Sequence, residues 1–165
     1  RSRGLGDVYK RQVINGMAEK ISLTHGKGFR SPQAFKAKDI TYKRNFSMKS
    51  GNKINAAGWE AIVLPFDVQS FSNEKQGELA PFNSGKKGAK PFWLAQMTTD
   101  GFEHTTAMKA NKPYIISLPN SESYEDEFNI SGEVQFHAED AGGVEVKATS
   151  YKELARIEGL SLIHI

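Results

Sequence analysis

Apolar and polar residues alternate in short runs along most of the chain, and Gly, Pro, Asn and Ser separate these runs. In 133–138 the apolar side chains fall on every second position, and 143–148 repeats this pattern. The alternation also holds in 41–48, except that Arg44 occupies a position of the apolar series. A period of two, with many β-branched and aromatic residues, predicts β-strands for these runs.

Four further apolar runs also predict strands, and they lie around Ile21, Trp93 and Ile115 and over 61–66. Pro65 and Pro119 each mark an edge position, a strand end or a bulge, because proline cannot donate a hydrogen bond to a β-ladder. About seven short strands with frequent turns predict an all-β fold, an antiparallel β-sandwich of the jelly-roll or immunoglobulin-like kind.

Five large apolar side chains are the expected anchors of the interior between the two layers. Full burial of each would contribute about 1.5–3 kcal/mol to folding. They are Trp59, Leu64, Phe66, Ile116 and Phe136, with Trp59 expected in the core or at its edge.

The predicted connections are short and polar. We expect the loop 83–90 to join the two strands of a hairpin, and the residues of 139–143 are typical of a turn. The sequence predicts one short helix over 151–158, where Ser150 and Glu153 have the spacing of a capping box.

Composition limits the class of protein. The 165 residues suffice for one domain with a hydrophobic core, and the lack of cysteine excludes disulfides, thiolate zinc sites and cysteine nucleophiles. The net charge of +3 arises in residues 1–12, which hold four basic residues and one acidic residue, whereas the remainder is neutral. We therefore expect no nucleic-acid partner. No run of about 18 apolar residues predicts a transmembrane segment.

The two ends differ in character from the rest of the chain. Residues 7–12 and 160–165 resemble translated sequencing-adapter read-through, which recurs at the ends of metagenomic reading frames. We therefore expect 1–12 and 160–165 to be non-native tails on a single β-sandwich domain at 13–159. On this interpretation the chain is a fragment of a longer gene, and the sandwich is truncated on its C-terminal side.

Five segments carry a family resemblance: ITYKRNF at 40–46, GWEAIVLPFDVQ at 58–69, FWLAQM at 92–97, ANKPYIISLPN at 110–120 and NISGEVQFHAED at 129–140. In this order they resemble a β-sandwich module of secreted Bacteroidales surface proteins, which often contain leucine-rich repeats or immunoglobulin-like domains. The family normally has further strands after the segment that matches 144–148.

The resemblance implies a non-catalytic structural or adhesion module at the outer membrane or outside the cell. Its partner would be an unknown protein or glycan at the cell surface. The alternative is a carbohydrate-binding module that stacks sugars on exposed aromatic rings, for which Trp93 and Phe102 are the candidates.

Sequence motifs for catalysis are missing. The four histidines lack the HExxH and HxH spacings, and GxSxG, GxxxxGK[ST] and GxGxxG do not occur. We therefore predict no enzymatic activity, no cofactor and no resident metal. If calcium binds, the acidic run at 122–127 is the candidate, because calcium takes about six to eight oxygen ligands; the alternative is a solvated loop. Its carboxylates are Glu122, Glu125, Asp126 and Glu127.

Overall fold

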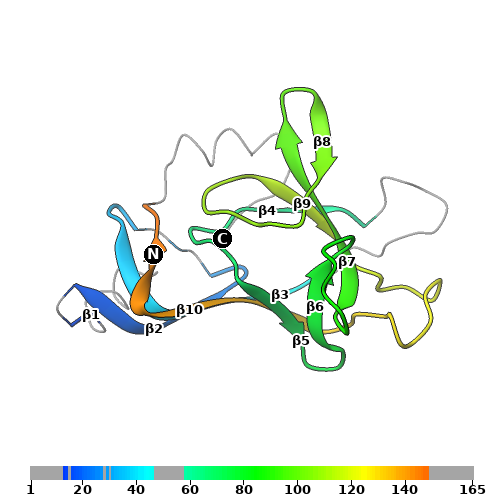
Figure 1. The fold of residues 1–165 in the computed structure, drawn as a ribbon, viewed down its shortest axis with the longest axis horizontal. Coiled ribbons are helices and arrows are strands. Elements are labelled where there is room, and N and C mark those ends of the chain that lie inside the picture. The colour runs from blue at the N-terminus through cyan, green and yellow to red at the C-terminus, as the bar shows by residue number, and fades with distance from the viewer. Residues whose placement is uncertain (1–12, 15, 28, 30, 47–57, 149–165) are drawn as a thin grey trace.

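The computed structural model describes residues 13–14, 16–27, 29, 31–46 and 58–148, and within these ranges the chain is all-β, with ten strands and no helix (Figure 1). The expected helix at 151–158 and the two adapter-like tails lie outside the described residues. Strand formation follows from the alternating pattern, since side chains at every second position of a strand share one face.

The strands are β1 (Val13–Ile14), β2 (Met17–Thr24), β3 (Phe35–Asn45), β4 (Glu60–Ile62), β5 (Ser70–Asn73), β6 (Gly77–Pro81), β7 (Lys90–Thr98), β8 (Gly101–His104), β9 (Tyr114–Ser117) and β10 (Glu133–Val146). They pair in the order β1-β2-β3-β10-β5-β6-β7-β9-β4, and β8 pairs with β7 beside this path.

The sheet is mixed, which corrects the expectation of purely antiparallel pairing. Strand β2 runs parallel to β3, and β6 runs parallel to β7. The loop 83–90 is therefore not a hairpin connection, because the strands that it joins have the same direction. Lys90, the first residue of β7, pairs with Leu79, so the loop has to return only from Pro81 to the level of Leu79. Alternation indicates which face of a strand is buried, but not the direction of its neighbour.

The sheet curls over on itself, and β7 makes the turn. Residues Lys90–Phe92 of β7 pair with β6, whereas Trp93–Gln96 pair with β9. Strands β9 and β4 thereby lie above β3, β10 and β5, and the molecule has the shape of a half-barrel (Figure 1). The hairpin that contains β8 projects away from this body.

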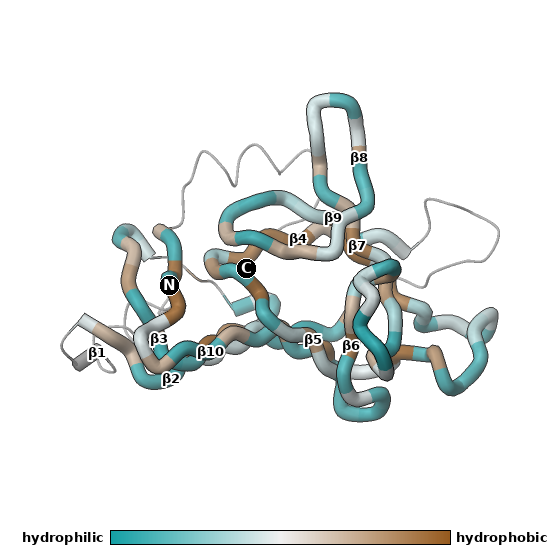
Figure 2. The backbone as a smooth tube through the Cα atoms, viewed as in Figure 1, coloured by the Kyte–Doolittle hydropathy of each residue, from teal (hydrophilic) through white to brown (hydrophobic). Residues whose placement is uncertain are grey.

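The core fills the space inside the curl. Phe136 is fully buried, and its ring contacts those of Tyr42, Phe46 and Phe71 at centroid distances of 5.6, 6.1 and 5.6 Å. Such tilted and edge-to-face aromatic pairs add to the free energy of apolar burial. In contrast, the outer turns of the loops are mainly hydrophilic (Figure 2).

Four of the five expected anchors lie in this core: Leu64, Phe66, Ile116 and Phe136 are at most 1% exposed. Trp59 is only partly buried, so it lies at the margin of the core rather than within it. It directly precedes β4, which is the last strand in the pairing order.

The apolar run 61–66 is buried throughout, but it is a strand only at its start. Beyond Ile62 its backbone leaves the ladder and bonds to other segments. The carbonyl of Leu64 accepts a hydrogen bond from Asn111 N at 2.7 Å, and the carbonyl of Pro65 accepts one from Lys147 N at 2.7 Å. These hydrogen bonds satisfy two buried backbone carbonyls that have no partner in a β-ladder.

A bend crosses three neighbouring strands at one level. The buried positions of β2 change phase between Ala18 and Ile21, and those of β3 change phase between Ala37 and Ile40. At the same level the register of β10 with β3 shifts between Glu139 and Val144.

The predicted turn at 139–143 is an irregularity inside one long strand, because this register shift falls within β10. The segment still contains a hydrogen bond typical of a turn: Asp140 Oδ1 accepts from Gly142 N at 2.8 Å. Extra residues on one strand bend it and increase its twist.

Gly143→Ala should lower the free energy of unfolding by about 1–3 kcal/mol. Gly143 has a φ of 96°, and a Cβ atom there would lie 2.8 Å from the Cβ of Lys36. Urea denaturation of both glycine variants measures the difference. The matched control is Gly142→Ala, whose Cβ would meet only Asp140 Oδ1 at 3.4 Å, so its cost should stay within about 0.5 kcal/mol. Equal losses in the two variants would contradict the strain at Gly143.

Candidate functional site

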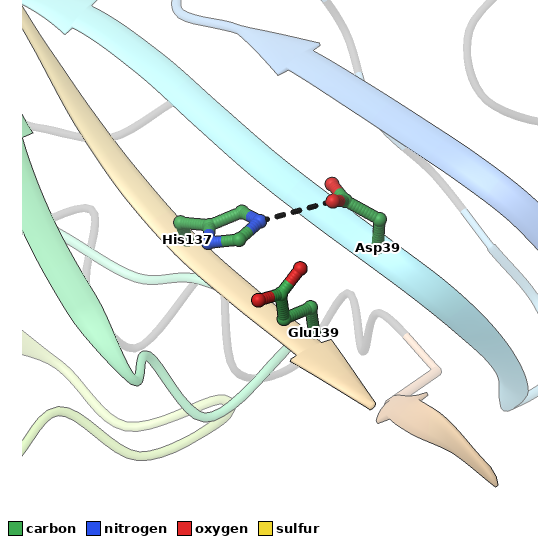
Figure 3. A group of neighbouring side chains, drawn as sticks. All are labelled: Asp39, His137 and Glu139. Atoms are coloured by element: carbon green, nitrogen blue, oxygen red, sulfur yellow. Dashed lines mark hydrogen bonds and ion pairs between the residues drawn. The ribbon is translucent and has the colours of Figure 1, made fainter. Parts of the chain in front are cut away.

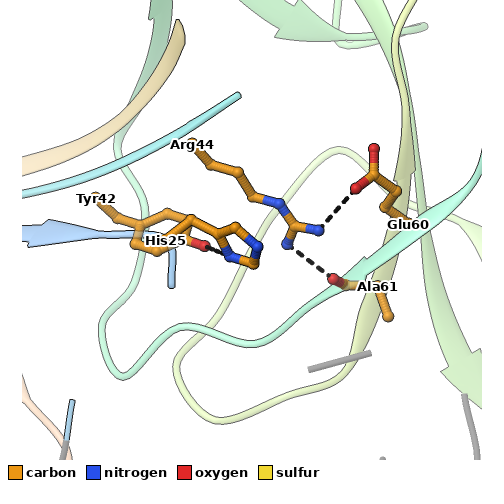
Figure 4. Close-up of polar contacts among 5 residues, drawn as sticks. All are labelled: His25, Tyr42, Arg44, Glu60 and Ala61. Carbon is orange, nitrogen blue, oxygen red and sulfur yellow. Dashed lines mark hydrogen bonds and ion pairs between the residues drawn. The ribbon is translucent and has the colours of Figure 1, made fainter. Parts of the chain in front are cut away.

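A buried ion pair joins the two layers of the half-barrel. Arg44, the exception in the alternating pattern, points inward from β3, and its Nη2 donates to Glu60 Oε1 in β4 at 2.9 Å (Figure 4). Its Nη1 donates to the carbonyl of Ala61 at 3.1 Å. The side chains of Arg44 and Glu60 are 5% and 12% exposed. At this burial each charge needs the other, because desolvation of an unpaired charge costs several kcal/mol.

Aromatic groups surround this pair. The Arg44 guanidinium lies 4.7 Å from the centroid of the Phe46 ring, and the hydroxyl of Tyr42 is 3.0 Å from His25 Nδ1. Burial raises the pKa of the Tyr42 phenol above 10.0, although the nearby Arg44 charge acts in the opposite direction. Arg44 links β3 to β4, and the contact between Tyr42 and His25 links β3 to the residue after β2, so we assign these groups a structural role.

A mixed cluster of His, Asp and Glu lies on the outer face of the bend (Figure 3). Asp39 of β3 is opposite Glu139 of β10, and His137 is two residues before Glu139 on the same face. His137 Nε2 is 3.1 Å from Asp39 Oδ2, and one potential ligand atom from each of the three residues lies within 4.8 Å of the others. Among the described residues it is the one group of this kind.

Sequence reasoning missed this cluster. Asp39 and His137 are 98 residues apart, and His137 belongs to no metal-binding spacing. The signal that could have revealed the cluster is the strong alternation of apolar and polar residues in both 40–46 and 133–140. This shared pattern suggests that the two segments pair as neighbouring strands. Their register brings the polar positions together, but a single sequence does not specify that register.

The acidic run does not converge on a cation site. Glu122, Glu125, Asp126 and Glu127 are exposed, and they form no ligand cluster in the part of the chain that the structure describes. The loop is instead tethered through its backbone, since Gln76 Nε2 donates to the carbonyls of Asp126 and Asn129. Glu127 lies 3.9 Å from Lys90 Nζ. This geometry is that of a solvated, anchored loop.

The two aromatic candidates for sugar binding lie on one face of the paired strands β7 and β8. Phe92 and Leu94 point into the core, so the alternate position Trp93 points outward, and it is partly buried. The Trp93 ring lies 5.8 Å from that of Tyr124. Phe102 is 48% exposed and opposite Met97, four positions beyond Trp93 on the same face. At about 3.3 Å per strand residue, Trp93 and Phe102 are roughly 13 Å apart along the strand.

Arg44→Met should lower the free energy of unfolding by about 3–5 kcal/mol, because Glu60 would stay buried without its partner. Guanidinium denaturation measures the loss. The matched control is Lys86→Met, which breaks the 2.8 Å pair with Glu78, in which both side chains are 48% exposed. Its cost should stay below about 1 kcal/mol. A double variant that also carries Glu60→Leu should recover part of the Arg44 loss, and equal losses in the two single variants would contradict the buried pair.

Stability should fall as the pH rises above about 10. Burial raises the pKa values of Tyr42 and Tyr114 above their ordinary value of 10.0, so the folded chain keeps protons that the unfolded chain releases. Each phenol can contribute a slope of up to about 1.4 kcal/mol per pH unit. Urea denaturation between pH 8 and pH 11 should show a shallower decline for Tyr42→Phe than for the wild type. Parallel curves would contradict this assignment.

Comparisons with known proteins leave the fold and the site without a family assignment. No family model, no curated protein and no solved structure matches the chain. The described residues also contain no helix with the length and apolar character that a bilayer crossing needs. The resemblance to the Bacteroidales surface module therefore stays a prediction, and the coordinates establish an all-β chain with a curled mixed sheet.

Proposed function

We propose that the chain is a non-catalytic structural or adhesion module of a secreted or cell-surface bacterial protein, with the layered character of a β-sandwich. The all-β fold and the five resembling segments support this role. The observation that carries this proposal is that buried polar groups bond to other parts of the chain. The Arg44 guanidinium bonds to Glu60 and to the carbonyl of Ala61. The Asn73 amide donates to the carbonyls of Ser131 and Glu133. These groups hold the frame together, which leaves the outer faces and loops for contact with a partner.

Adhesion would use surfaces that project from this frame. The β8 hairpin extends away from the body (Figure 1). The loop at 121–129 is held by Gln76 and Asn129, whose amides donate to backbone carbonyls. A rigid frame with tethered loops lowers the entropy cost of binding, because less of the surface has to become ordered.

A carbohydrate-binding module is the second candidate, and the position of Trp93 favours it. Its ring is partly exposed beside Tyr124, and Phe102 lies exposed on the same face. Aromatic rings with one polar and one apolar part suit ligands that present both kinds of surface. Stacking of a sugar against Trp93 would place neighbouring sugar units toward Phe102.

A glycan array and a cell-adhesion assay distinguish the two roles. Under the adhesion hypothesis, beads coated with the chain bind bacterial or epithelial cells, excess soluble chain competes, and the array gives no signal. Under the sugar hypothesis the array gives a signal that Trp93→Ala weakens by about tenfold or more, as expected for an aromatic anchor that contributes about 2 kcal/mol. Phe82→Ala, at a 50% exposed ring outside this face, is the control. No adhesion and no array signal would contradict both roles.

A further inference from the structure

The bend in the sheet presents three metal-ligating groups on one face. Asp39 and Glu139 are direct cross-strand partners, and His137 precedes Glu139 by two positions, so all three side chains leave the sheet on the same side (Figure 3). Cβ atoms of direct cross-strand partners are about 5 Å apart, which is close enough for two carboxylates to share a cation. The outward face follows from the opposite burial of Ile40 and Ala138, whose side chains enter the core.

One carboxylate oxygen of this group has no partner. Asp39 Oδ2 is 3.1 Å from His137 Nε2, but Asp39 Oδ1 is inaccessible to solvent and accepts no hydrogen bond. A carboxylate oxygen removed from water without a partner is unfavourable. A cation held by this carboxylate would compensate its charge, and this orphaned oxygen is an observation independent of the clustering itself.

The chemistry of the donors selects the kind of cation. One imidazole nitrogen with two carboxylates suits Zn²⁺ and related divalent transition metals, whereas calcium and magnesium prefer sites made entirely of oxygen. We propose that Asp39, His137 and Glu139 bind a divalent transition-metal ion of the Zn²⁺ type on the outer face of β3 and β10. The remaining coordination positions would belong to water or to a partner. This site does not depend on the proposed adhesion role.

The surroundings fix the backbone of β10 at Glu139 and leave the site with a net negative charge. Gln69 Oε1 accepts a hydrogen bond from the backbone N–H of Glu139 at 3.1 Å, which ties β10 to the segment before β5. Asp140 follows directly and adds a further carboxylate near the bend. Lys20 of β2 is the register partner of Asp39 on the other side, so one cation neighbours the group. A transition metal would take the place of the direct contact between His137 Nε2 and Asp39 Oδ2, with the unprotonated nitrogen as its ligand.

Isothermal titration calorimetry of the tag-free chain with ZnCl₂ tests the proposal. We expect one Zn²⁺ per chain, with binding weakened by about tenfold or more in each of His137→Gln, Asp39→Asn and Glu139→Gln. Circular dichroism checks that each variant is folded. CaCl₂ and MgCl₂ should give no heat of binding at the same concentrations. Tight binding of Ca²⁺ in place of Zn²⁺ would overturn the assignment of the metal class.

Two control variants separate this site from other surface ligands. His104→Gln removes an exposed imidazole of β8, and Glu127→Gln removes a carboxylate of the acidic run; both should bind Zn²⁺ as the wild type does. In NMR spectra, Zn²⁺ should shift the imidazole resonances of His137 and leave those of His104 in place. The absence of Zn²⁺ binding, or binding that persists unchanged in His137→Gln, would overturn the proposal.

Discussion

The buried pair between Arg44 and Glu60 constrains how the half-barrel closes. The curl of the sheet brings β4 over β3, and the ion pair links these strands at 2.9 Å in a place where both side chains are nearly inaccessible. A charge in that environment is tolerated only with its partner, so the pair sets how the layers meet. The aromatic contacts around Phe136 then fill the enclosed space. Apolar burial supplies most of the stabilising free energy, and the ion pair restricts how the curl can close.

The second constraint is the bend that crosses β2, β3 and β10. Each of these strands changes which positions it buries, or shifts its register, at the same level. The local shift in β10 needs a residue at a φ of 96°, which Gly143 provides. The bend curves the sheet, and on its outer face it also gathers Asp39, His137 and Glu139. One irregularity thus serves both the shape of the fold and the proposed metal site.

The two surfaces proposed for binding belong to different parts of the sheet. The His137 cluster lies on β3 and β10, whereas the Trp93 face lies on β7 and β8. They are adjacent neither in sequence nor in strand order. Neither surface uses the Arg44 pair, so a substitution on either can alter binding without removing an interaction on which the frame depends.

Local alternation predicted an all-β chain and the strand around Phe136, because periodicity records which side of a strand faces the core. The burial of Leu64, Phe66 and Ile116 followed from the apolar character of their runs. The alternation also singled out Arg44, although not its partner. The parallel pairs and the passage of β10 through the bend arose only in the tertiary structure. Strand direction and register depend on contacts between segments that are far apart in the sequence. The periodic pattern within each segment does not record these contacts. For the same reason the meeting of Asp39 with His137, 98 residues away, was decided by the fold.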